Sequence, residues 1–248
     1  MFPLLLAMAV NATTLHAEEN LDYLFKMSLE ELLKVKITGS TLTPKELKTV
    51  PSAVTVFTHN EINKLGLDTL DELMNLVPGF QSYRGSSSSA EYLFSSRGRR
   101  ISAEGSEILI LVDGMRFAGP RNSGSTNIAP KYPLMQVERV EFIRGPGSAV
   151  YGSNAMMGVI NIITRSDIDE VNIAYGSFDR RKAHLLAATK IRDFKVDLFA
   201  YMEMDEGDDY RVQDTFSTNR ISTDDPRDIG SLNFKLQWQN TYLNLQHN

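Results

Sequence analysis

Two short apolar segments joined by a glycine-rich turn lie within residues 137–164, and they constrain the fold more than any other part of the chain. In residues 137–144, apolar and charged residues interleave, a pattern that suits a short strand in a small domain. A Gly-Pro-Gly run at 145–147 favours a tight turn, because Gly permits positive φ and Pro fixes its own φ. The β-branched residues of 158–164 predict a second strand. The sequence therefore predicts two strands that flank one compact turn.

The spacing of the glycines argues against a phosphate-binding loop. A dinucleotide fingerprint needs Gly three positions after its second Gly, where this chain has Val150. A P-loop needs Gly-Lys followed by Ser or Thr, whereas the chain has Gly152-Ser153-Asn154. Nucleotide binding is therefore not expected.

Length and composition allow one or two globular domains. The chain has 248 residues, of which 42% are hydrophobic and 23% are charged, so it is able to bury a core. The net charge of -5 argues against a broadly basic nucleic-acid surface. The absence of Cys excludes disulfides, thiolate zinc sites and cysteine nucleophiles. After the N-terminus no apolar run is long enough for a membrane-spanning helix, so a membrane location would require β-strands or a partner.

Five blocks of sequence, taken together, resemble the plug domain of the TonB-dependent outer-membrane receptors, which import scarce nutrients across the outer membrane of Gram-negative bacteria. Each block alone is weak, but their order and spacing match that domain. The blocks are 51–58 (PSAVTVFT), 69–80 (TLDELMNLVPGF), 96–98 (SRG), 110–116 (ILVDGMR) and 137–164. The resemblance implies an α+β plug domain at 50–165, followed at 166–248 by antiparallel β-strands of an incomplete transmembrane β-barrel.

The region after residue 165 carries the alternation expected of such strands. Residues 194–204 and 232–238 place apolar side chains on one face and mixed polar side chains on the other, as in the lumen of a barrel. Further strands are expected near 171–175, 182–189 and 243–245, with a long polar connection at 205–230. These are about five strands, whereas receptors of the family close a barrel of about 22. We therefore expect an N-terminal fragment; a soluble β-sandwich with one wet face is the alternative.

The N-terminal part is expected to direct export of the chain and to bind a partner. Residues 1–17 resemble a secretory signal peptide without a basic n-region, and the alternative is a buried N-terminal strand or helix. Residues 18–49 would then be a periplasmic extension with the TonB box, a segment that adds as a strand to TonB through its backbone. The candidate residues for TonB binding are Leu33, Val35, Ile37 and Thr38. An ordinary linker is the alternative interpretation of the same residues.

Two capping-box patterns predict short helices within the plug. Thr58 with Glu61 starts a helix that ends near Gly66, and Thr69 with Glu72 starts one that continues until Pro78-Gly79. In the second helix, apolar residues at helical spacing face a core; they are Leu70, Leu73, Met74 and Val77. His59 is expected beside the first helix start and not in a metal site, because no second ligand lies at a suitable spacing.

The loops at 81–100 and 115–131 are rich in Ser, Gly, Asn and Arg and are the candidate ligand site. Six Arg stand against four acids between residues 84 and 121, and this local positive excess favours an anionic ligand. Because the plug's apical loops contact substrate in the family, the candidate ligand-binding residues are Tyr83, Arg84, Arg116, Phe117, Arg121 and Asn122. Arg97 and Arg144 are instead expected to pin the plug to carboxylates of the barrel. Solvated loop arginines are the alternative for the first group.

The resemblance implies active import and not catalysis. The expected substrate is a ferric siderophore or another large nutrient such as haem or cobalamin, and the expected partners are TonB (with ExbB/ExbD energy supply) and outer-membrane lipid. The protein would lie in the Gram-negative outer membrane, with the plug inside the barrel and the N-terminus periplasmic. No catalytic set, cofactor or metal site is expected, since the four His residues are scattered. A ligand-binding or signalling receptor without transport and a soluble periplasmic interaction domain are the alternatives.

Overall fold

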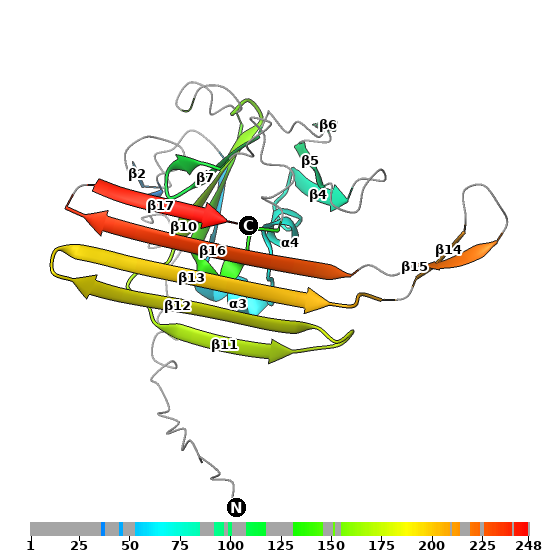
Figure 1. Cartoon of the computed structure of the whole chain (residues 1–248). Coiled ribbons are helices and arrows are strands. Elements are labelled where there is room, and N and C mark those ends of the chain that lie inside the picture. The colour runs from blue at the N-terminus through cyan, green and yellow to red at the C-terminus, as the bar shows by residue number, and fades with distance from the viewer. Residues whose placement is uncertain are drawn as a thin grey trace, which may run out of the picture.

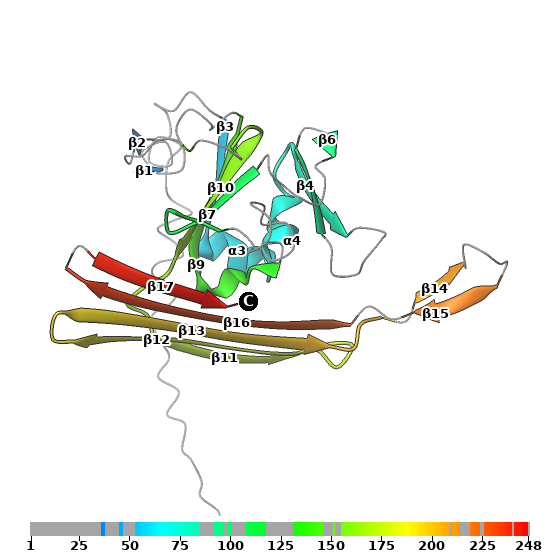
Figure 2. The same cartoon turned by 45° about the horizontal axis from the view of Figure 1, so that its top comes forward.

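The strands predicted within 137–164 form the centre of a small domain. β9 (Val137–Arg144) and β10 (Gly158–Thr164) pair antiparallel, with Val159 opposite Ile143 and Ile162 opposite Val140. In the computed structural model this domain stands over a long antiparallel sheet (Figures 1 and 2). The structure describes residues 36–37, 45–46, 53–84, 92–96, 99–100, 108–117, 131–145, 151, 155–208, 210–213, 219–223, 226–239 and 241–247.

The small domain, which we call the plug, is built on a mixed five-stranded sheet in the order β3-β9-β10-β7-β8. The added strands are β3 (Ala53–Thr58), β7 (Ile108–Val112) and β8 (Met115–Arg116). β7 runs parallel to β10, and every other neighbour is antiparallel. All five residues of β7 are buried, because an apolar cluster covers each face of the sheet at this strand.

Two short helices cover one face of the plug sheet. α3 (His59–Leu65) begins at a capping box in which the Thr58 amide donates to Glu61 Oε2 at 2.8 Å, and Gly66 ends the helix at φ 68°. α4 (Leu70–Met74) begins at Thr69, whose amide donates to Glu72 Oε2 at 3.3 Å. A one-turn helix, η3 (Leu134–Gln136), precedes β9. Both predicted helix starts are therefore observed.

The predicted length of the second helix is wrong. α4 stops at Met74, well before Pro78, because the chain continues in tight turns in which the amides of Leu76 and Val77 donate to the carbonyls of Leu73 and Met74. Val77 is nevertheless buried with the rest of the predicted apolar stripe. Its burial explains why the stripe alone suggested a longer helix.

Smaller elements complete the plug side. β4 (Phe80–Arg84), β5 (Tyr92–Ser96) and β6 (Arg99–Arg100) form a three-stranded sheet next to α4. β1 (Lys36–Ile37) and β2 (Lys45–Glu46) form a two-residue antiparallel ladder.

The long sheet, which we call the wall, contains five antiparallel strands in the order β11-β12-β13-β16-β17. They are β11 (Glu170–Tyr175), β12 (Arg181–Ile191), β13 (Phe194–Asp205), β16 (Arg227–Trp238) and β17 (Thr241–His247). Short turns join most neighbours, but the connection from β13 to β16 is long and carries a hairpin of β14 (Tyr210–Gln213) and β15 (Arg220–Thr223). This is the predicted strand set with its predicted long connection, and the sheet is not closed into a barrel.

The two faces of the wall differ in polarity. On β11 the face away from the plug exposes Val171, Ile173 and Tyr175, and Ile173 is 81% exposed. On β13 the face toward the plug buries Phe199, Tyr201 and Glu203. Among the described residues, the apolar cluster on this inner face is small, and the plug contributes Met135 to it. The wall and the plug therefore do not share one large core, in contrast to the β-sandwich alternative. None of the described helices has the length and apolarity needed to cross a bilayer.

Candidate functional site

The candidate site is the seam where the plug meets the inner face of the wall. At one end of the seam lies Asp68, in the turn between α3 and α4. Asp68 accepts from Arg180 at 2.7 Å and from Lys182 Nζ at 2.6 Å; Arg180 lies in the turn just before β12, and Lys182 lies in β12. Arg180 also donates from Nε (2.9 Å) and from a terminal nitrogen (2.6 Å) to Oε1 of Glu203, a fully buried residue of β13. Tyr201 donates its hydroxyl proton to the same carboxylate. The buried charge of Glu203 is thus compensated by Arg180, as burial requires.

A second ion pair lies at the same end of the seam. Arg227, the first residue of β16, lies 3.8 Å from Glu72 of α4. Glu72 also accepts the Asp68 amide at 2.8 Å, so one carboxylate caps the helix and faces the wall. The short helix therefore positions both acids of this end, Asp68 and Glu72.

The other end of the seam is organised by Asp113, at the tip of the β7–β8 hairpin. Asp113 has a left-handed backbone (φ 50°) next to Gly114 (φ 79°), the geometry that Asp-Gly favours in a tight hairpin. Its carboxylate accepts from the Thr164 amide at 2.9 Å and hydroxyl at 2.8 Å. Lys235 of β16 places its Nζ 2.5 Å from the same carboxylate and also contacts the Thr164 hydroxyl. One turn residue thereby joins the plug to the wall.

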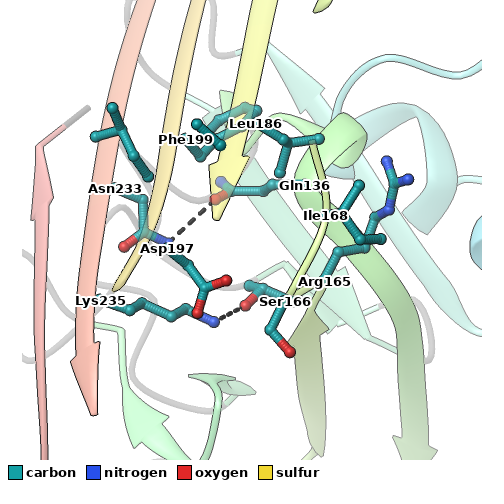
Figure 3. Close-up of a pocket in the computed structure, with 12 residues that line it drawn as sticks. Gln136, Arg165, Ser166, Ile168, Leu186, Asp197, Phe199, Asn233 and Lys235 are labelled. Atoms are coloured by element: carbon teal, nitrogen blue, oxygen red, sulfur yellow. Dashed lines mark hydrogen bonds between the residues drawn. The ribbon is translucent and has the colours of Figure 1, made fainter. Parts of the chain in front are cut away.

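A small pocket lies in the seam beside Lys235 (Figure 3). The side-chain Nδ2 of Asn233 in the wall donates to Oε1 of Gln136 in the plug at 3.1 Å. The side-chain Oδ1 of Asn233 is buried without a hydrogen-bond partner among the described residues. The enclosed space is about 10 Å³, which is room for about one water molecule. The pocket therefore cannot hold a metal chelate. Its lining is Gln136, Thr164, Arg165, Ser166, Ile168, Leu186, Ala187, Asp197, Leu198, Phe199, Asn233 and Lys235.

Near the start of β11, a third set of polar groups connects the plug to the wall. Arg165 donates to Glu170 Oε2 at 2.8 Å, and the other oxygen of Glu170 lies 2.8 Å from His184 Nε2. His59 of α3 bonds the Val137 carbonyl through Nδ1 at 2.9 Å. Burial, followed by the nearby positive charge of Arg165, lowers the pKa of His59 below its ordinary value. No group of three or more His, Cys, Asp or Glu among the described residues is arranged to hold a metal.

The structure places only some of the predicted ligand-binding residues. Tyr83 is half-buried in β4, and Arg84 ends the same strand. Arg116 ends β8 and is exposed, whereas Phe117 packs edge to face on Tyr132 of the plug core, with ring centroids 5.6 Å apart. Arg121 and Asn122 lie outside the described residues. The ligand site therefore stays a prediction.

Of the residues predicted to pin the plug to the barrel, Arg97 lies outside the described part and Arg144 is placed. Arg144 donates to the Pro78 carbonyl at 3.3 Å, within the plug. Of the predicted TonB-binding residues, Ile37 lies in β1, where it pairs with Lys45, while Leu33, Val35 and Thr38 lie outside the described residues. The predicted roles of all six residues remain untested.

Sequence reasoning missed the residues that form the seam. Asp68, Glu72, Asp113, Arg180, Lys182, Arg227 and Lys235 were not singled out as site residues. The alternation in 194–204 did place the acids of β13 on the inner face. The four ion pairs of Asp68, Glu72 and Asp113 with the wall, however, each join residues more than 100 positions apart in the sequence. Only the docked arrangement of plug and wall brings them together.

This arrangement defines a class of protein: a domain with its own core, held by polar contacts against the inner face of an antiparallel sheet whose outer face is apolar. Residues 46–159 match the model of the TonB-dependent Receptor Plug Domain. Residues 46–159 therefore match the plug domain of TonB-dependent receptors, and the wall that follows them is similar in fold to strands of solved receptors.

Solved structures of receptors share the fold. The ferripyoverdine receptor of the outer membrane of Pseudomonas aeruginosa matches 85% of this chain and 26% of its own (TM-score 0.63, 17% identity). The ferric yersiniabactin uptake receptor FyuA from Yersinia pestis matches 76% and 29% (TM-score 0.55, 22% identity). A mutant of the ferric enterobactin receptor PfeA from Pseudomonas aeruginosa, in complex with enterobactin, matches 79% and 32% (TM-score 0.55, 23% identity). The chain thus spans roughly a quarter to a third of these receptors' length.

Proposed function

We propose that the chain is the plug and the first barrel strands of an outer-membrane receptor that actively imports a ferric siderophore or a comparable large nutrient, such as haem or cobalamin. The observation that carries this proposal is the seam. A plug with a separate apolar core is held to the wall mainly by ion pairs and hydrogen bonds, so it can move without exposing a large shared core. The proposed organisation is a signal peptide at 1–17, a periplasmic extension at 18–49, the plug at 50–165 and barrel strands at 166–248.

The outer face of the wall supports a location in outer-membrane lipid. Large apolar side chains are exposed on this face over all five strands, and they include Ile173, Leu185, Met202, Leu232 and Leu245. A contiguous apolar face of this kind is unfavourable in water and is the face that a barrel presents to acyl chains. The long connection between β13 and β16 fits the external side, and the short turns that follow Ile191 and Trp238, at the opposite end of the sheet, fit the periplasmic side.

A ferric chelate is the preferred substrate class because the predicted ligand loops are rich in arginine. Guanidinium groups bind carboxylate or catecholate oxygens in bidentate fashion, and aromatic rings pack against the organic part of a chelate. The matched structures include receptors bound to ferripyoverdine and to enterobactin. The energy for release into the periplasm would come from TonB, with ExbB/ExbD as its energy supply.

The first experiment tests coupling to TonB in a complete receptor that carries this chain. Replacing Ile37 with Pro removes a backbone donor from β1 and should abolish energised uptake of a radiolabelled ferric chelate while ligand binding stays unchanged. Lys45→Pro, in the strand paired with Ile37, is the matched control and should retain uptake. Normal uptake by the Ile37→Pro receptor would reject this placement of the TonB box.

The second experiment tests the ligand site. Replacing Arg84 and Arg116 together with Ala should weaken ligand binding by about tenfold or more, since a hydrogen bond to a charged group contributes roughly 1.5–3 kcal/mol. Calorimetric titration with individual ferric siderophores, haem and cobalamin measures the affinity and identifies the substrate. Replacing Arg192, in the short turn between β12 and β13, with Ala is the control for loss of charge. Equal affinity of the double variant and the parent receptor would remove both arginines from the site.

A further inference from the structure

Most of the ion pairs between plug and wall have the same polarity. In four of the five pairs among the described residues that join the plug to a wall strand or to the turn before β12, the plug supplies the acid and the wall supplies the cation. The acids are Asp68, Glu72 and Asp113, and the cations are Arg180, Lys182, Arg227 and Lys235. The fifth pair, Arg165 of the plug with Glu170 at the start of β11, has the opposite sense and joins residues only five positions apart.

Three of these wall cations also have a wall acid directly opposite on the neighbouring strand. In the register of the sheet, Lys235 lies opposite Asp197, Arg227 opposite Asp205, and Lys182 opposite Glu203. Residues directly opposite in an antiparallel pair have Cβ atoms about 4.5–5.5 Å apart and point to the same face. Each of these three cations therefore has two carboxylates within reach, one on the plug and one on its own sheet.

Two of the opposite wall acids have no ion pair in the docked state. Among the described residues, Asp197 accepts only the Asp167 amide at 2.8 Å, and Asp205 accepts only the Gly207 amide at 3.0 Å. Asp197 and Lys235 line the same water-sized pocket, and Figure 3 shows the Asp197 carboxylate beside the Lys235 side chain. Lys235 is thus bound to the plug although a carboxylate of its own sheet stands next to it.

We propose that the wall exchanges ion-pair partners when the plug is displaced: Lys235 passes from Asp113 to Asp197, and Arg227 passes from Glu72 to Asp205. Removing one partner of a half-buried ion pair normally leaves an uncompensated charge, which is costly. The exchange supplies a replacement for both of these cations, so displacement of the plug costs less than the number of broken ion pairs would suggest. The proposal rests on the proposed function only in requiring that the plug moves relative to the wall.

The test measures plug release in the full chain in detergent micelles. The chain has no native Cys, so Cys introduced at the exposed Leu76 of the plug and Leu243 of β17 can carry spin labels. The distance between the labels, measured in increasing urea, gives a midpoint for release of the plug. Asp113→Asn should lower this midpoint, because it weakens only the docked state.

Asp197→Asn is the decisive variant. Asn keeps the acceptor for the Asp167 amide but removes the replacement charge, so the midpoint should rise, with the release equilibrium reduced about two- to fivefold, the range for a cross-strand ion pair. The rise should vanish when Lys235 is already replaced by Met. Asp167→Asn, which loses an ion pair only with Lys195 of the wall, should leave the midpoint unchanged.

An unchanged or lowered midpoint in Asp197→Asn, or an equal rise in the Lys235→Met background, would overturn the exchange. Asp205→Asn with Arg227→Met repeats the comparison at the other end of the seam, should Asp197→Asn fail to fold. The assay contains no TonB, substrate or energy source. A receptor that fails to transport would therefore contradict the proposed function and leave this result standing.

Discussion

The hydrogen bonds and surroundings of His59 favour its uncharged form. Its Nδ1 donates to the Val137 carbonyl, and its Nε2 lies 2.9 Å from the Asn63 amide nitrogen, which identifies Nε2 as the acceptor of the neutral ring. The positive charge of Arg165 lies nearby, and burial disfavours the imidazolium. The pKa of this histidine is therefore lower in the folded chain than in the unfolded chain.

This state predicts a loss of stability in mild acid. Because the pKa of His59 is lowered on folding, the unfolded state binds the proton first as pH falls below the ordinary value of about 6.5. The free energy of unfolding should thus decrease from pH 7.5 toward pH 5.5, as measured by urea titration of the full chain. His59→Asn, which retains a donor near the Nδ1 position, should reduce this decrease.

The control for this prediction is His247→Asn, at the exposed end of β17. The variant should leave the pH dependence as it is in the parent chain. If His59→Asn showed the same acid-induced loss as the parent, another group would be responsible for it.

At the scale of the element, local signals in the sequence predicted most of the fold. Both capping boxes marked true helix starts, because the Ser/Thr and Glu pattern satisfies the same amides wherever it occurs. Alternation predicted the strands of the wall and the polarity of each face of β13, although β12 and β16 extend beyond the predicted segments. The antiparallel register supports these longer strands by pairing them with β13 over their whole length.

The errors and omissions at this scale have a common cause. α4 ends early because backbone turns replace helical hydrogen bonds while Val77 remains buried, and a periodic apolar pattern does not distinguish these cases. The parallel pairing of β7 with β10 joins segments about 50 residues apart, and no local pattern specifies it. The seam charges were missed for the same reason: their partners are set by docking.

At the scale of the whole molecule, the chain has one tryptophan, and it lies on the outer face of the wall. Trp238 ends β16, is 46% exposed and stacks on Phe194 of β13, with ring centroids 5.9 Å apart. Aromatic residues at strand ends form the girdles that lie at the interface between lipid and water in barrels. Trp238 is therefore expected at headgroup depth.

Fluorescence can test this placement directly. Adding phosphatidylcholine vesicles to the full chain should shift the Trp238 emission to shorter wavelength, and lipids brominated near the headgroup should quench it more strongly than lipids brominated deep in the acyl chains. Trp238→Phe provides the blank, since it leaves no tryptophan. Emission that stays at the wavelength of a water-exposed indole would contradict a lipid-facing outer surface.

The separate core of the plug has a consequence for biogenesis. Residues between Val54 and Ile162 form both apolar clusters of the plug, and among the described residues no member of either cluster comes from the wall. This domain precedes the wall along the chain, so in the proposed outer-membrane receptor it can fold in water before the wall strands insert into the bilayer. The order of synthesis and the order of assembly would then agree, because the folded plug would be present before the wall strands assemble around it.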